Sequence, residues 1–231
     1  MGISISTPPI ALGDRAILVR LGQSIDETSF CQVQSLLRHL ENFTHPAIVE
    51  CVPAFVSLTI HYDPLRGTFD EVCLHLKAAI ESVDVTQSFL DRVIEIPVCY
   101  GGEFGEDLEF VAQHHGLSEN EVIALHSSAE YLVHMIGFAP GFPYLGGLPE
   151  RIRTPRRATP RLRIPAGSVG LAGGQTGIYP LATPGGWQLI GRTPRALFKP
   201  SDRPPSLLVA GDQVRFRPIS AAEFRQQCEY D

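Results

Sequence analysis

Arginines concentrate in one short segment of this chain. Six of its 19 basic residues fall within 13 positions, and two Thr-Pro pairs, 154–155 and 159–160, lie among them. The six are Arg151, Arg153, Arg156, Arg157, Arg161 and Arg163. A guanidinium group donates two parallel hydrogen bonds to a carboxylate or phosphate, and proline stiffens the backbone that carries it. The segment therefore predicts recognition of an anionic substrate, a nucleotide or an acidic partner surface, with a solvated loop as the alternative.

A second segment, residues 137–145, reads Gly-Phe-Ala-Pro-Gly-Phe-Pro-Tyr-Leu and combines three aromatic rings with two prolines. Rigid rings next to glycines suit a ligand-lining wall or an interface, and they suit equally a buried barrel corner. Two glycine-rich segments, 173–177 and 184–187, predict loops where another part of the molecule approaches the backbone closely.

Two common catalytic motifs are absent from the sequence. The chain has only Lys77 and Lys199, so it contains no phosphate-binding Gly-x-x-x-x-Gly-Lys motif. The segment Gly167-Ser168-Val169-Gly170 has Ala166 where a nucleophile elbow needs glycine, which disfavours a serine hydrolase. Five widely spaced cysteines form no Cys-x-x-Cys pair and are expected to be reduced thiols.

His126 is the histidine that we consider for proton transfer. It follows a helical pattern and precedes the predicted strand at Tyr131, a junction where a side chain can face a cleft. A structural or merely exposed histidine is the alternative. No His-Glu-x-x-His pattern exists, and we predict no metal site.

The elements that must position these residues differ between the two halves of the chain. The first half predicts strands at 16–21, 47–52 and 55–62 and helices at 25–43 and 69–83. Asp26 or Ser24 would cap the first helix. A strand at 92–98 would either complete a ferredoxin-like β-α-β-β-α-β sandwich or open a second domain.

The second half begins with two short helices at 108–115 and 119–125, the latter capped by Ser118 with Glu121 three residues later. From Tyr131 onward short apolar runs alternate with Gly and Pro, which predicts a small β-barrel. We therefore expect an α+β protein with an α/β domain at 1–90 and a barrel domain at 91–231.

Composition excludes several classes of protein. With 44% hydrophobic residues, 19% charged residues and a formal charge of −6, the chain is typical of a globular protein and has no general attraction to nucleic acid. No apolar run reaches the ~20 residues of a membrane span, and the N-terminus lacks the pattern of a secretory signal. We expect a cytoplasmic protein without nucleic-acid or membrane partners.

Several long strings resemble the family of the 5-oxoprolinase B subunit, also described as the sporulation-kinase inhibitor KipI and as allophanate hydrolase subunit 1. The similar strings are Leu125-His126 with Tyr131, GFAPGFPYLGGLP (137–149), TPRRATPRLRIPAGSVGLAGGQTGIYP (154–180), TPGGW (183–187), IGRTP (190–194) and GDQVRFRPI (211–219). The resemblance implies a small α/β N-terminal domain, which the element order above predicts to be ferredoxin-like, followed by a cyclophilin-like barrel. Fused relatives form a carboxyltransferase-like domain.

The resemblance also implies an activity, the ATP-dependent opening of 5-oxo-L-proline to L-glutamate. The implied partners are the KipA-like C subunit and the A subunit of 5-oxoprolinase, and ATP, with or without magnesium, would be bound wholly or partly by them. We expect the chain alone to be inactive. The expected catalytic residues are His126, Arg157 and Gln175, and the expected substrate- or anion-binding residues are Arg156, Arg161, Tyr144 and Trp187.

Three functions stay open from the sequence. The chain would act as part of an enzyme together with its partners, as a KipI-type protein that binds and inhibits a histidine kinase, or as a module that binds proline-containing peptides. Membership of a urea- or allophanate-related amidohydrolase is a variant of the first. Barrel resemblance by itself does not carry isomerase function, which weakens the peptide-binding interpretation.

Overall fold

The computed structural model describes residues 8–85 and 92–228. The chain divides into two compact units, Met1–Phe89 and Leu90–Asp231. The predicted boundary near residue 90 lies outside the described residues. None of the helices in the described residues combines the length and apolar character of a membrane span.

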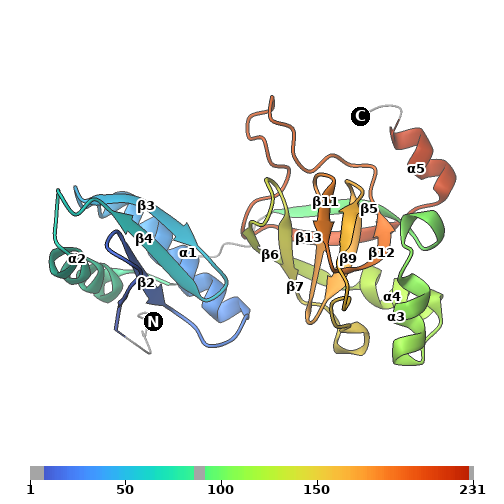
Figure 1. The fold of residues 1–231 in the computed structure, drawn as a ribbon, viewed down its shortest axis with the longest axis horizontal. Helices are drawn as coiled ribbons and strands as arrows, with labels where there is room; N and C mark the ends of the chain where they lie inside the picture. The colour runs from blue at the N-terminus through green and yellow to red at the C-terminus, as the bar shows by residue number, and fades with distance from the viewer. Residues whose placement is uncertain (1–7, 86–91, 229–231) are drawn as a thin grey trace. The chain divides into compact units, whose positions relative to one another are not determined.

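The first unit contains one antiparallel sheet and two helices (Figure 1). Its strands are β1 (Ile10–Ala11), β2 (Ala16–Arg20), β3 (Ile48–Pro53) and β4 (Ser57–Tyr62), and its helices are α1 (Glu27–Asn42) and α2 (Phe69–Ser82). The strand order is β1-β2-β4-β3. Apolar residues that alternate along β2 and β4, such as Ile17 and Ile60, pack against Leu36 of α1 and Leu76 of α2.

Side chains cap the starts of both helices of this unit, and the cap predicted for the first helix is confirmed. Asp26 accepts a hydrogen bond from the Ser29 amide at 2.8 Å, which makes it the cap of α1. At α2, Thr68 and Glu71 bond each other's backbone amides reciprocally. These contacts satisfy amides that the helices themselves leave unpaired.

The strand at the start of the second unit, β5 (Val93–Tyr100), resolves one of the alternatives. It pairs with β13 (Gln213–Pro218) and β12 (Gln188–Arg192), not with the sheet of the first unit. The two-residue strand β1 pairs with β2, at the edge where a ferredoxin-like sandwich would place its final strand. The ferredoxin-like expectation is therefore not confirmed, and β5 belongs to the second unit.

The second unit is built around a closed barrel in the order β10-β7-β6-β13-β5-β12-β9. The remaining barrel strands are β6 (Glu130–Ile136), β7 (Pro143–Gly146), β9 (Ser168–Ala172) and β10 (Gln175–Ile178). Its core is filled by β-branched and aromatic side chains, among them Tyr131, Val169 and Val214. The predicted barrel is confirmed as a closed sheet, in a chain of mixed α and β structure.

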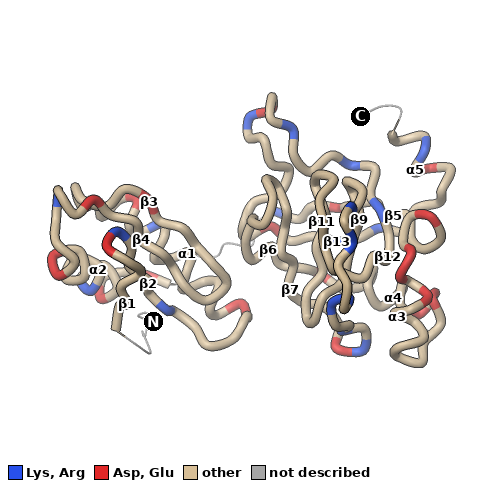
Figure 2. Tube along the Cα trace, in the orientation of Figure 1, with Lys and Arg blue, Asp and Glu red and all other residues tan. Residues whose placement is uncertain are grey.

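Short elements surround the barrel. They are η1 (Gly102–Phe104), α3 (Leu108–His115), α4 (Glu119–Ser128), η2 (Glu150–Ile152), α5 (Ala221–Cys228) and a two-stranded sheet of β8 (Arg161–Ile164) and β11 (Thr183–Gly185). Figure 1 shows α3 and α4 adjacent to each other beside the barrel. Ser118 and Glu121 form the predicted capping box of α4. The arginine-rich segment spans η2 and β8. Figure 2 shows the Lys and Arg positions of the barrel unit in blue.

Candidate functional site

A buried carboxylate organises the arginine-rich segment. Asp107, which directly precedes α3, has a side chain only 6% exposed. It accepts hydrogen bonds from Arg157 Nη1 at 2.8 Å, from Arg161 Nη1 at 2.8 Å and from the Leu189 amide at 2.7 Å. Its hydrogen bonds raise the pKa of Arg161 above the ordinary value. Arg157, predicted to be catalytic, and Arg161, predicted to bind an anion, thus already bind a carboxylate of the chain itself.

A pocket of about 390 Å³ lies next to the ion pair of Asp107 and Arg157, since Arg157 is part of its lining. Its lining comprises Phe110 of α3, Gln188 of β12 and the residues 155–159 that lead into β8. Arg156 and Arg157 both belong to this lining. The segment therefore combines an internal ion pair with a cavity large enough for a small molecule.

Aromatic side chains stand beside the pocket. The guanidinium carbon of Arg156 lies 6.0 Å from the centre of the Trp187 ring, at the outer limit of a cation–π contact. The Tyr144 and Trp187 rings lie 6.0 Å apart, and Phe142 contacts both. Gly177 lies beneath them, since an added Cβ would meet Phe142, Pro143 and Trp187 within 3.0 Å. This is the close backbone approach expected of the glycine-rich segment.

His126 lies elsewhere, inside the barrel unit. It has no exposed surface, and its ring stacks on Phe216 of β13. Its Nδ1 is 2.8 Å from the Tyr100 hydroxyl and its Nε2 is 3.0 Å from the Thr176 hydroxyl, while burial lowers its pKa to about 3. The interpretation that His126 faces a cleft is wrong, because α4 turns this side chain into the core. A buried neutral ring fits the structural alternative.

The structure brings together some predicted site residues and separates others. Arg156 and Tyr144 each lie near the Trp187 ring, and Arg157 and Arg161 meet at Asp107. Gln175 begins β10, its Nε2 is buried, and no described residue accepts a hydrogen bond from it. Among the described residues, neither a hydrogen bond nor an ion pair joins Gln175 or His126 to Arg156, Arg157 or Arg161.

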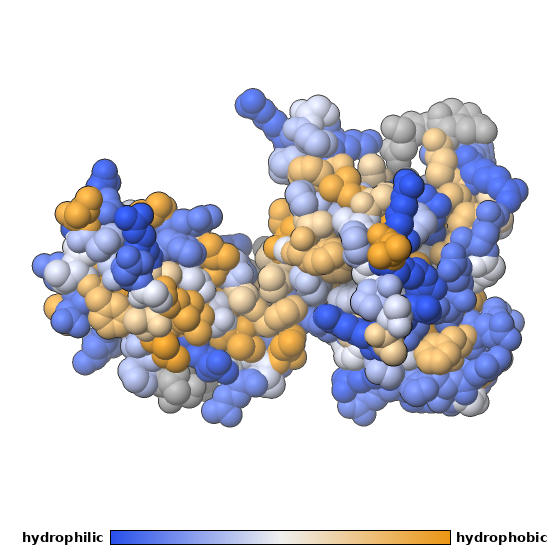
Figure 3. Space-filling model, in the orientation of Figure 1, coloured by the Kyte–Doolittle hydropathy of each residue, from blue (hydrophilic) through white to orange (hydrophobic). Residues whose placement is uncertain are grey.

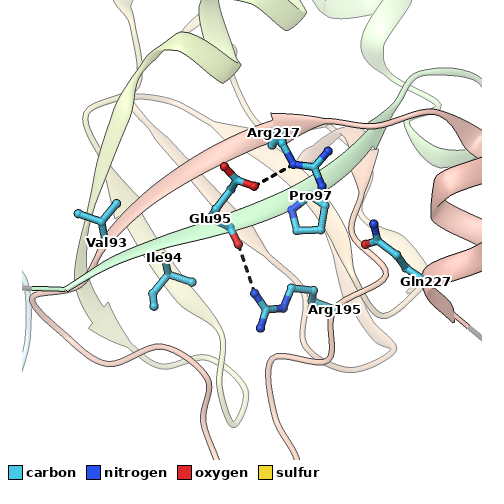
Figure 4. Close-up of a pocket in the computed structure, with 7 residues that line it drawn as sticks. All are labelled: Val93, Ile94, Glu95, Pro97, Arg195, Arg217 and Gln227. Carbon is cyan, nitrogen blue, oxygen red and sulfur yellow. Dashed lines mark hydrogen bonds and ion pairs between the residues drawn. The ribbon is translucent and has the colours of Figure 1, made fainter. Parts of the chain in front are cut away.

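A larger pocket, of about 600 Å³, lies along β5 (Figure 4). Its arginines are already engaged: Arg217 Nε donates to Glu95 Oε1 at 2.8 Å, and Arg195 Nη1 donates to the Glu95 carbonyl at 3.4 Å. None of the predicted site residues lines it. We therefore take the pocket at Gln188 as the candidate site.

The sequence interpretation missed three residues of this site, Asp107, Phe110 and Gln188. As a polar residue directly before a helical pattern, Asp107 could have been predicted as a helix cap, but not as a site residue. In the structure its side chain does not cap α3 and instead accepts hydrogen bonds from β12 and the arginines. Gln188 gave a clearer indication in the sequence, because it is a polar residue directly before the apolar pair Leu189-Ile190 of a strand. Within the described residues, no group of three or more His, Cys, Asp or Glu is arranged to hold a metal ion.

The surface around the site is mixed in character. On the face of the barrel unit in Figure 3, hydrophilic side chains surround scattered apolar ones. The strand β8 carries both kinds, with the apolar Leu162 between Arg161 and Arg163 and 93% exposed.

Comparison with known proteins gives a consistent result. Residues 10–208 match the family model of the carboxyltransferase domain, subdomain C and D. The chain is 50% identical over 224 residues to the 5-oxoprolinase B subunit of Bacillus subtilis, an alignment that covers 92% of this chain and 93% of that protein.

Two solved structures add to this. The conserved uncharacterized protein PH0987 of Pyrococcus horikoshii is 48% identical, covers 94% of this chain and 99% of its own, and has a TM-score of 0.57. Urea amidolyase of Kluyveromyces lactis shares the fold at a TM-score of 0.80, with 24% identity over 96% of this chain and 15% of its own.

Proposed function

The chain belongs to the carboxyltransferase-domain family and, within it, to the family of the 5-oxoprolinase B subunit, and from this membership we propose that it is the B subunit of a 5-oxoprolinase complex. The observation that carries the proposal is 50% identity to the Bacillus subtilis protein over nearly the whole length of both chains. The fold shared with urea amidolyase, at 24% identity, does not extend to that enzyme's substrate.

The reaction opens a cyclic amide. Water adds to the lactam carbonyl carbon of 5-oxo-L-proline, the carbon–nitrogen bond breaks, and the nitrogen takes up a proton to give the amine of L-glutamate. Both the substrate and the tetrahedral intermediate carry negative charge at neutral pH, which arginines stabilise. The arginine-rich segment supplies such groups next to a pocket of suitable size, which supports the proposal.

The sequence of this chain lacks the lysine-containing phosphate-binding motif of P-loop nucleotide sites. We therefore assign ATP binding to the partners, the A subunit and the KipA-like C subunit, in a cytoplasmic complex. The chain by itself would then be inactive.

The test is reconstitution. The chain is co-purified with homologues of the A and C subunits encoded in the same genome, and glutamate release from 5-oxo-L-proline is measured with and without ATP. The expected result is ATP-dependent release that requires all three chains. A stable three-chain complex that releases no glutamate would contradict the proposal, and inhibition of a histidine kinase would then be the function to test.

A further inference from the structure

Gln188 leaves a hydrogen-bond acceptor unused inside the site. Its side chain is 3% exposed, and its Nε2 donates to the Pro155 carbonyl at 3.0 Å. The Oε1 of the same amide is buried and accepts from no donor among the described residues. A buried acceptor without a partner costs about 1–3 kcal/mol, so its retention calls for a ligand or an ordered water.

Arg157 leaves a donor unused in the same lining. Its Nη1 is held by Asp107 at 2.8 Å, which fixes the direction of the planar guanidinium. Its Nε is buried and donates to no acceptor among the described residues. Arg157 and Gln188 both line the pocket, so this lining holds one unused donor and one unused acceptor, both buried beneath its surface.

A charge and apolar walls complete the pocket. Arg156 is exposed and is joined to no carboxylate among the described residues, and its guanidinium lies near the Trp187 ring. Phe110, about half exposed, and Pro155 supply apolar surface. The lining thus combines a cation, two hydrogen-bonding groups and a hydrophobic wall.

A lactam matches this combination. A five-membered ring holds its amide in the cis form, so that the N–H and the C=O lie on the same edge of the molecule. Such an edge can donate to one group and accept from a neighbouring one. In 5-oxo-L-proline the ring also carries a carboxylate, which a guanidinium binds.

From this match we infer that the pocket lined by Phe110, residues 155–159 and Gln188 binds the lactam substrate, with the lactam N–H on Gln188 Oε1, the lactam oxygen on Arg157 Nε and the carboxylate on Arg156. The inference rests on the proposed function, because that function supplies the substrate. It makes Gln188 the residue that distinguishes an amide with a free N–H from one without. The cavity of about 390 Å³ lies within the range of small-molecule sites.

The test compares three probes by calorimetry, on the full chain and on the three-chain complex: 5-oxo-L-proline, its N-methyl derivative and 2-pyrrolidinone. The N-methyl derivative lacks the N–H, and 2-pyrrolidinone lacks the carboxylate. We expect each to bind at least about tenfold more weakly than 5-oxo-L-proline, because each leaves a polar group of the site unpaired.

Variants assign each preference to a residue. Gln188→Met removes the acceptor at similar volume and should abolish the preference over the N-methyl derivative. Arg156→Ala should abolish the preference over 2-pyrrolidinone and keep the N–H preference. Arg20→Ala, at an exposed arginine outside both the pocket and the arginine-rich segment, is the matched control and should bind all three probes as the wild type does.

A second variant keeps the inference testable if Gln188→Met fails to fold. Ala158 is exposed and lines the pocket, so Ala158→Phe should block binding and leave the melting temperature unchanged. Binding unaffected by Ala158→Phe, or absence of binding to both the chain and the complex, would overturn the inference.

Failure of the inference and failure of the proposed function give different results. If the wild-type complex releases glutamate and Ala158→Phe leaves its KM unchanged, the substrate site lies elsewhere and the proposed function stands. If the complex binds 5-oxo-L-proline through Gln188 and Arg156 but releases no glutamate, the binding site stands and the proposed function fails.

Discussion

The Thr176 hydroxyl determines which nitrogen of His126 carries the proton. Thr176 Oγ1 donates to the Gly170 carbonyl at 3.0 Å, so it accepts from His126 Nε2, also at 3.0 Å. The other nitrogen, Nδ1, is then unprotonated and accepts from the Tyr100 hydroxyl at 2.8 Å. The ring is therefore a neutral link between β5 and β10 in the barrel core.

The neutrality of His126 predicts a stability that falls with acid. Burial lowers its pKa from 6.5 to about 3 in the folded protein, so between these pH values the unfolded chain binds the extra proton. The free energy of unfolding should drop by roughly 1.4 kcal/mol per pH unit across that window from this residue alone. Urea denaturation at pH 7.5, 5.5 and 4.5 measures it.

The control for this pH dependence is a change at an exposed histidine. His126→Gln should flatten the slope below pH 6.5 at the expense of overall stability, whereas His114→Gln should keep the wild-type slope. An equal slope in wild type and His126→Gln would show that other groups cause the acid sensitivity.

Asp107→Asn should destabilise the protein strongly. It removes the charge that pairs with Arg157 and Arg161 and leaves these guanidinium groups next to a neutral amide. Breaking a buried ion pair from one side costs about 3–5 kcal/mol, although the partial exposure of Arg157 reduces the share that this arginine contributes. Chemical denaturation at neutral pH gives the value.

The matched control for Asp107 is Glu150→Gln. Glu150 pairs with Arg153 at 3.1 Å in an exposed ion pair, so its loss should change stability by less than about 1 kcal/mol. Equal effects of the two substitutions would show that Asp107 does not organise the arginine-rich segment.

Gly105→Ala should disrupt the segment that leads to Asp107. A Cβ at Gly105 would collide with the backbone carbonyl of Ile190 in β12, and only a backbone shift can relieve this overlap. We expect a loss of at least about 2 kcal/mol in the free energy of unfolding. Gly174→Ala, whose Cβ would meet Arg153 at 3.5 Å, should be tolerated within about 1 kcal/mol, and a reversed order would refute the packing argument.

Phe138 adopts a backbone conformation that favours glycine. Its φ is 68°, the residue is 62% exposed, and its ring makes edge contacts with Phe142 and Tyr179. Both Phe138→Gly and Phe138→Ala lose these contacts, but only glycine adopts this φ without cost. Phe138→Gly should therefore be more stable than Phe138→Ala by about 1 kcal/mol in urea denaturation, and equal stabilities would be the contrary outcome.

Local patterns predicted most of the helices and strands. The helix expected at 108–115 is α3 at the same residues, and the caps at Asp26 and Ser118 are confirmed. These elements are specified by periodicity and capping within a few residues of sequence, and that information is fully present in one chain.

Long-range pairing could not be predicted in the same way. The partner of Arg157 and Arg161 is Asp107, about 50 residues earlier, and nothing in the spacing of the arginines indicates it. The orientation of His126 depends on which face of α4 packs against the barrel. The alternation of apolar and polar residues along this short helix is too weak to predict that face. Arg156 and Arg157 of the pocket were therefore found by residue type, whereas Phe110, Gln188 and the neighbouring Asp107 were found only from the structure.

The parallel pairing of β5 with β13 has a consequence for synthesis. Val93 to Val98 align with Gln213 to Pro218, so the first strand of the barrel unit finds its neighbour only when the last one has been made. On the ribosome, both edges of β5 stay unpaired until β12 has emerged, and the edge that pairs with β13 stays unpaired until residues 213–218 have emerged. During that interval the nascent chain is exposed to misassociation, and a chaperone that shields sheet edges would raise the yield of folded protein.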